Sequence, residues 1–178
     1  MRLIASHAVQ ADLVHYAKTG YPEEICGLLA GHGEQVLRVI PTDNIASDKQ
    51  GGFLIPQSAF NDHLPKIRAE GLSLIGFYHS HPNTPPIPSP TDVRELDNGL
   101  KLPHVIIGIA PQRAEIKAWM VKNGQVDPIE WVVGDIPTIP LPITTNAQTI
   151  AFVMSVVVSL MLLITIALTL LPPAPPLP

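Results

Sequence analysis

The sequence predicts an α+β fold, in which helices flank a curved and mostly antiparallel sheet, followed by one C-terminal transmembrane helix. Two observations lead to this prediction. Short apolar, strand-like segments alternate with amphipathic helical segments and are joined by hairpin turns, which favours a mixed fold. The composition then changes after Gly134, and the chain finishes with a long run that contains no charged residue.

The first elements are a helix and a hairpin. Ser6 is a suitable N-cap for a helix that continues to Lys18. Its apolar residues at helical spacing are Val9, Leu13 and Ala17. An apolar strand is expected over 25–30, and a turn around His32 leads into an alternating strand over 36–40.

The middle of the chain carries a loop, a helix and a buried strand. Residues 41–52 are polar and typical of a loop, and a short extended segment follows at 53–55. A helix is expected over 58–70, with Pro65 breaking or restarting it, because proline cannot donate the helical hydrogen bond. The apolar run at 72–78 predicts a buried strand.

The last part of the domain is expected to contain one short helix and three strands. Asp92 should open the helix, and Gly99 should end it. Asn123-Gly124 is a strong signal for a hairpin turn. The strands of this part are predicted over 105–110, 115–121 and 129–133.

Composition excludes several classes of function. The net charge of −4 and the absence of a basic run argue against nucleic acid as a partner. The single cysteine excludes an internal disulfide and suits a reducing compartment. No signal-peptide pattern is found near Met1, so we expect no signal peptide there.

One stretch carries metal-ligand chemistry. His79 and His81 are two residues apart, so a strand places both imidazoles on one face. Asp92 supplies a third ligand, and three protein ligands leave one zinc position open for water, as catalytic sites do. The loop over 82–90 holds five prolines, which stiffen it. The alternatives are a hydrogen-bonded pair of core histidines and adventitious metal binding.

These residues resemble a known family. His79-Ser80-His81-Pro82, with Ser89 and Asp92 after it, is similar to the signature of the JAMM (MPN-plus) zinc metallopeptidases, in the form of its compact prokaryotic members. The family's upstream pattern E-x-x-G-L-L-x-G matches residues 24–31. The resemblance implies a cytidine-deaminase-like core and one Zn²⁺ per chain, held by His79, His81 and Asp92. It makes Glu24 the general base and gives Ser89 a hydrogen bond to the tetrahedral oxyanion.

The resemblance also implies a substrate. Members of the family release ubiquitin-like or small sulfur-carrier proteins at a C-terminal Gly-Gly, so we expect a zinc-dependent isopeptidase. Two alternatives stay open: a non-catalytic MPN-type binding module, and a metallopeptidase for an unrelated small amide. Cys26 is expected to be a small core residue and not a nucleophile, and Trp119 and Trp131 are expected to be packing groups. The remaining histidines are expected to be surface or satisfied residues, namely His7, His15, His32, His63 and His104.

The C-terminal part is expected to anchor the chain in a lipid bilayer. Ile150–Leu171 is a run of 22 residues without charge, which as a helix spans roughly 33 Å, enough for a hydrocarbon core of about 30 Å. The catalytic domain is expected in the cytosol, because no signal sequence precedes it and the tail is uncharged. The predicted parts are a metallopeptidase domain (1–134), a Pro/Thr-rich linker (135–149), a single-pass transmembrane helix (150–171) and a Pro-rich tail (172–178).

Overall fold

The computed structural model describes residues 1–96, 101–110, 113–135 and 147–170, without the side chains at 147–150, 153 and 166–170. The chain divides into two compact units, Met1–Pro140 and Leu141–Pro178, which are treated separately below. Most of the predicted linker and the whole predicted tail lie outside the described residues. The domain boundaries derived from the sequence therefore stay a prediction.

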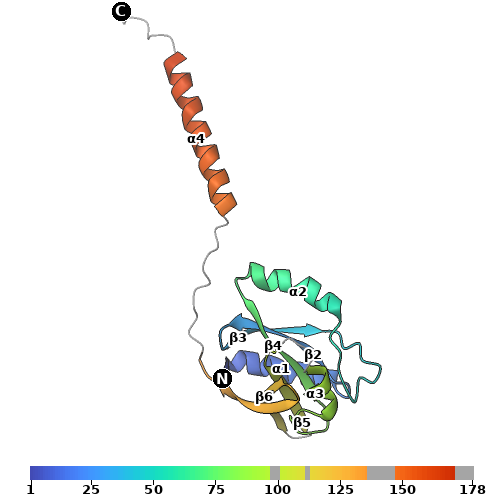
Figure 1. The fold of residues 1–178 in the computed structure, drawn as a ribbon. Coiled ribbons are helices and arrows are strands. Elements are labelled where there is room, and N and C mark those ends of the chain that lie inside the picture. Colours follow the sequence, from blue (N-terminus) through green and yellow to red (C-terminus); the bar gives the residue numbers. More distant parts are fainter. Residues whose placement is uncertain (97–100, 111–112, 136–146, 171–178) are drawn as a thin grey trace, which may run out of the picture. The chain divides into compact units, whose positions relative to one another are not determined.

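The described strands close into a barrel in the order β1-β3-β2-β4-β5-β6-β7 (Figure 1). They are β1 (Arg2–Ala5), β2 (Cys26–His32), β3 (Gln35–Thr42), β4 (Ser73–His81), β5 (His104–Ala110), β6 (Arg113–Lys122) and β7 (Gln125–Val133). Pairing is antiparallel for β2–β3, β2–β4, β5–β6 and β6–β7. The predicted curved, mostly antiparallel sheet is thus present, but it closes, because the unpredicted strand β1 pairs in parallel with both β3 and β7.

Three helices belong to the described residues of the first unit: α1 (His7–Gly20), α2 (Gln57–Ala69) and α3 (Pro90–Leu96). The predicted cap of α1 is confirmed, since the hydroxyl of Ser6 accepts a hydrogen bond from the amide of Val9 at 3.2 Å. The predicted break at Pro65 is wrong, because α2 continues through it. Pro65 lies on the exposed side of α2, while Ile67 on the buried side packs against Ala30 of the sheet.

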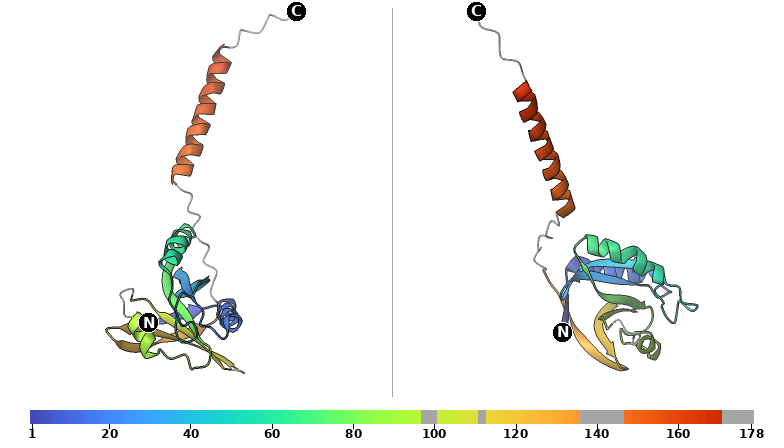
Figure 2. Two further views of the ribbon diagram at one scale, coloured as in Figure 1. Left: turned by 90° about the vertical axis from the view of Figure 1, so that its right-hand side faces the viewer. Right: turned by 45° about the horizontal axis from the view of Figure 1, so that its top comes forward.

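Two helices cover opposite faces of the same strands (Figure 2). Leu29 belongs to the main core cluster, which includes Leu13 of α1, whereas its neighbour Ala30 packs with Ile67 of α2. Successive residues of a strand point to opposite faces, so α1 and α2 lie on the two sides of β2. The strands next to β2, including β4, are therefore buried within the first unit.

The hairpin between β6 and β7 confirms the turn predicted from the sequence. Asn123 and Gly124 have φ angles of 52° and 72°, the left-handed conformation that a two-residue turn of this kind requires. Glycine adopts it without a steric penalty, and asparagine tolerates it better than most residues do.

The second unit contains α4 (Ala147–Leu170). Within the part of the chain that the structure describes, no helix is found that is long and apolar enough to cross a membrane. The predicted transmembrane helix over Ile150–Leu171 therefore has no support from the structure. That statement covers the described residues alone, which leave out the side chains at 147–150, 153 and 166–170.

Candidate metal centre

β4 places the two histidines of the predicted site. It pairs in antiparallel fashion with β2 and in parallel with β5, so it is a central strand. His79 and His81 lie at its C-terminal end and are 0% and 4% exposed. The alternation of a strand directs both side chains to the same face, as predicted.

α3 supplies the third predicted ligand, Asp92, and Ser89 directly precedes the first residue of this helix. The Ser89 amide donates to Oδ2 of Asp92 at 2.6 Å, and the Asp92 amide donates to the Ser89 hydroxyl at 3.1 Å. This reciprocal pair is a capping box. The helix consequently begins at Pro90 and not at Asp92 as predicted, because Ser89 is the cap and proline suits the first helical position. Its predicted end at Gly99 lies outside the described residues.

The proline-rich loop between β4 and α3 is fastened to the barrel. Trp119 of β6 donates its indole N–H to the carbonyl of Pro86 at 2.9 Å. The loop also crosses Gly108 of β5 so closely that a Cβ atom there would lie 2.6 Å from Cδ of Pro86. His81 donates its Nδ1 proton to the carbonyl of Pro85 at 2.8 Å. Trp119 was predicted as a packing group, and its additional role is to hold this loop.

The three predicted ligands come together as a compact cluster. One nitrogen or oxygen from each of His79, His81 and Asp92 lies within 4.8 Å of the others. The Nε2 atoms of the two histidines are 2.9 Å apart, and they lie 3.3 Å (His81) and 3.7 Å (His79) from the Asp92 oxygens. A tetrahedral ion with bonds of about 2.0–2.1 Å needs ligand atoms about 3.3 Å apart. The donor set and its spacing therefore fit Zn²⁺.

The ionisation of the cluster also suits a cation. Burial lowers the pKa of His79, so its imidazole is neutral. Burial acts in the same direction on His81, but hydrogen bonds to Asp92 and Pro85 outweigh it and raise the pKa. Burial opposes ionisation of Asp92, yet its hydrogen bonds to His79 and His81 dominate and hold the pKa well below the usual range. Asp92 is thus a carboxylate that faces two imidazoles.

Glu24 lies beside this cluster, just before β2. Its side chain is buried, and Oε2 has no hydrogen-bond partner among the described residues. The pKa of Glu24 is raised to about 7, mainly by burial; His81 lowers it, and Asp92 raises it further. Glu24 precedes the strand that was predicted over 25–30 and that begins at Cys26 in the structure.

Backbone contacts fix the position of Glu24. The hydroxyl of Ser80, between the two histidines, accepts a hydrogen bond from the Ile25 amide at 3.0 Å, and the Ser80 amide donates to the Ile25 carbonyl at 2.9 Å. On the other side, the Glu24 carbonyl accepts from the side chain of Asn44 at 2.9 Å, and the Glu24 amide donates to the Lys49 carbonyl at 2.7 Å. The sequence predicted no role for Ser80, which is named only as part of the motif, and none for Asn44.

His104 is the residue of the site that sequence reasoning missed most clearly. It was expected to be a surface or satisfied residue, but it is fully buried at the start of β5, and its Nε2 lies 2.6 Å from Nδ1 of His79. Phe53 stacks on both rings, with centroids 4.2 Å from His79 and 5.4 Å from His104. The only signal in the sequence was a histidine at the edge of an apolar strand.

Cys26 has the surroundings of a core thiol. Its side chain is 1% exposed and donates to the carbonyl of Asp43 at 3.7 Å. Burial raises its pKa, which disfavours the thiolate that a nucleophile requires.

The chain belongs to the family of prokaryotic homologs of the JAB domain, whose model matches residues 6–122. This result confirms the family predicted from the two motifs.

Two curated relatives are similar to this chain. It is 38% identical over 104 residues, 58% of this chain and 66% of the other, to a protein of Thermus thermophilus named "Probable TtuB-protein conjugate cleaving protease". It is 36% identical over 97 residues, 51% of this chain and 70% of the other, to a protein of Haloferax volcanii named "Desampylase". The solution structure of a protein from Desulfitobacterium hafniense is also similar, with a TM-score of 0.68 and 28% identity over 75% of this chain and 94% of that one.

Proposed function

We propose that this chain is a zinc-dependent isopeptidase, which hydrolyses the amide bond at the C-terminal glycine of a ubiquitin-like or sulfur-carrier protein. The observation that carries the proposal is the free carboxyl oxygen of Glu24, buried beside a three-ligand cluster that fits zinc. The names of the two relatives, both of which refer to the removal of protein conjugates, support the substrate class.

His79, His81 and Asp92 would hold the zinc ion. When bound, zinc acidifies a water molecule and polarises the carbonyl of the scissile bond. Both histidines present Nε2 to the cluster, and the hydrogen bond from Nδ1 of His81 to Pro85 leaves its Nε2 unprotonated in the neutral ring. Asp92 stays ionised, and the two hydrogen bonds with Ser89 orient it.

Glu24 is the general base of the proposed reaction. Its pKa near 7 matches a physiological pH, where a base gains most from being able both to accept and to release a proton. Oε2, which has no other partner among the described residues, accepts a proton from the attacking water. The same carboxyl then delivers this proton to the leaving lysine amine, so no covalent intermediate is needed.

Ser89 stabilises the negative charge that develops on the carbonyl oxygen. Its hydroxyl oxygen accepts a hydrogen bond from the Asp92 amide, which leaves its own proton available to donate. A donor aimed at such an oxygen contributes strongly in a site shielded from water.

The proposal is tested by cleavage of a conjugate in which the C-terminal glycine of a ubiquitin-like carrier is joined to a lysine side chain. We expect the full chain to release the carrier with an intact C-terminus, as read by mass spectrometry. A chelator should abolish the reaction, and added zinc should restore it. Glu24→Gln should retain zinc and lose about 10²–10⁴-fold in rate. The same substitution at the exposed neighbour Glu23 is the matched control. Cleavage that persists in Glu24→Gln would refute the assignment of the base.

Attachment to a lipid bilayer through Ile150–Leu171, with the catalytic domain in the cytosol, is proposed as well. It is supported by the 22 uncharged residues of the sequence and by exposed apolar side chains of α4, such as Phe152 and Met161. A charge at the centre of a membrane span costs about 2.5–3.5 kcal/mol. Val157→Arg combined with Met161→Arg should therefore move the protein from the membrane fraction to the soluble one, whereas Val157→Leu with Met161→Leu should not. Wild-type protein in the soluble fraction would contradict the attachment.

A further inference from the structure

His104 makes a short contact with a ligand of the candidate metal centre. Its Nε2 lies 2.6 Å from Nδ1 of His79, and the two ring centroids are 4.7 Å apart. The contact depends on the parallel pairing of β5 with β4, in which His104 is opposite Phe77, two residues before His79. Both imidazoles are buried, so water does not compete for this hydrogen bond.

A hydrogen bond between two neutral imidazoles has one donor and one acceptor. Which of the two rings donates determines whether Nε2 of His79 presents a lone pair or a proton to the cluster. If Nδ1 of His79 donates to His104, then Nε2 of His79 carries a free lone pair toward His81 and Asp92. If His104 donates instead, then Nε2 of His79 carries the proton and cannot bind a metal. Only the first arrangement is compatible with a metal ion held by the Nε2 atoms.

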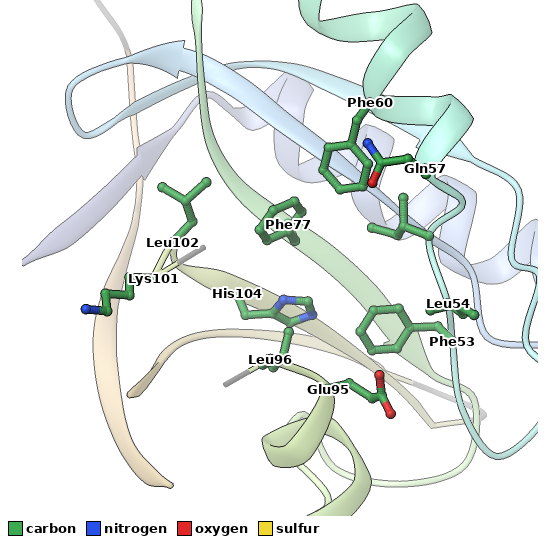
Figure 3. Close-up of a pocket in the computed structure, with 11 residues that line it drawn as sticks. Phe53, Leu54, Gln57, Phe60, Phe77, Glu95, Leu96, Lys101, Leu102 and His104 are labelled. Carbon is green, nitrogen blue, oxygen red and sulfur yellow. The ribbon is translucent and has the colours of Figure 1, made fainter. Parts of the chain in front are cut away.

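Among the described residues, no other contact opposes that choice. Nδ1 of His104 has no hydrogen-bond partner among the described residues. Its ring lines a pocket of about 400 Å³ next to Phe77 and Phe53, and the Gln57 and Glu95 side chains that line the same pocket accept no hydrogen bond from it (Figure 3). The bond to His79 is thus the one that sets the proton position on both rings.

We propose that His104 is a positioning residue of the metal centre: it accepts the Nδ1 proton of His79 and thereby fixes the tautomer whose Nε2 binds zinc. The inference rests on the proposed function only in taking zinc as the metal. Phe53, stacked across both rings, restricts their rotation and keeps the bond aligned.

Imidazole NMR of the zinc-loaded full chain tests this directly, because long-range ¹H–¹⁵N couplings report which ring nitrogen carries the proton. We expect a protonated Nδ1 on His79, and on His104 a protonated Nδ1 with a bare Nε2. A proton on Nε2 of His104 would overturn the proposal. This measurement uses the wild-type protein, so it does not depend on the folding of any variant.

Zinc affinity, measured by competition with a chromophoric chelator, gives the second readout. His104→Leu should weaken zinc binding about 10–100-fold, as the loss of a partner behind a metal ligand does. His104→Gln keeps an acceptor oxygen and should recover most of the affinity. Phe53→Leu is the control, because it removes the stacking ring but leaves the acceptor in place, and it should weaken binding less than His104→Leu does.

The outcomes separate this inference from the proposed function. Equal losses in the Leu and Gln variants of His104, with both folded by circular dichroism, would overturn the positioning role alone. Zinc binding with the expected tautomers, but no cleavage of any conjugate, would support the positioning role and refute the isopeptidase. A wild-type chain that binds no zinc would overturn both.

Discussion

The raised pKa of Glu24 predicts that this residue destabilises the metal-free protein at neutral pH. Its carboxyl group is buried without a hydrogen-bond partner among the described residues, so the ionised form loses the solvation that it has in the unfolded chain. Glu24→Gln removes the ionisation and nearly preserves the shape of the side chain. The variant should therefore lack the pH dependence of stability that Glu24 causes.

The sign and the size of this pH dependence follow from the difference between the pKa of Glu24 in the folded chain and in the unfolded chain. The pKa of Glu24 is raised from 4.5 to about 7, so the folded state keeps its proton at pH values where the unfolded state has lost it. The contribution of Glu24 to stability is thus fully present below pH 4.5 and declines as the pH rises to about 7. The difference corresponds to about 3 kcal/mol in the free energy of unfolding. Relative to the wild type, the Gln variant should gain this amount between pH 4.5 and pH 8.

Urea unfolding in the presence of a chelator, at several pH values, measures this difference. The variant and the wild type are compared at each pH, so that contributions from other groups, including Asp92, cancel. Glu23→Gln is the matched control, because Glu23 is exposed at the preceding position and should change the pH profile little. A wild-type profile parallel to that of Glu24→Gln across the whole range would refute the reasoning.

Two further substitutions test the proline-rich loop between β4 and α3 and the residue Ser89 at its end. Ser89→Ala should keep zinc and lower kcat by about 10²-fold or more, as the loss of an oxyanion donor does. Steady-state kinetics and metal analysis measure both effects, and an unchanged kcat would refute the role of Ser89 as a donor to the oxyanion. Trp119→Phe removes the donor to the Pro86 carbonyl and should cost about 1 kcal/mol of stability by chemical denaturation, whereas an unaltered midpoint would show that the bond does not hold the loop.

The sequence was most informative where local rules operate. The cap at Ser6, the buried face of α1 and the turn at Asn123-Gly124 follow from short-range preferences, and the structure confirms them. The spacing of His79 and His81 on one strand predicted part of the metal cluster for the same reason. The prediction of Asp92 as a ligand depended on the motif. In the structure, the capping box with Ser89 holds this side chain in place.

Long-range pairing explains what the sequence did not reveal. β1 has only four residues, and its partners β3 and β7 lie far along the chain, so closure of the barrel leaves no local pattern. His104 meets His79 only because β5 pairs in parallel with β4. Pro65 would break an isolated helix, but the packing of Ile67 against the sheet outweighs that preference.

The most direct test of the central claim is the zinc K-edge X-ray absorption spectrum of the full chain loaded with one equivalent of zinc. We expect two imidazole nitrogens at about 2.0–2.1 Å and carboxylate or water oxygens at about 2.0–2.2 Å, without sulfur at about 2.3 Å. His81→Ala and Asp92→Ala should each remove the bound zinc. A sulfur ligand, or one bound zinc per chain with an unaltered spectrum in both variants, would contradict a metal centre built from His79, His81 and Asp92.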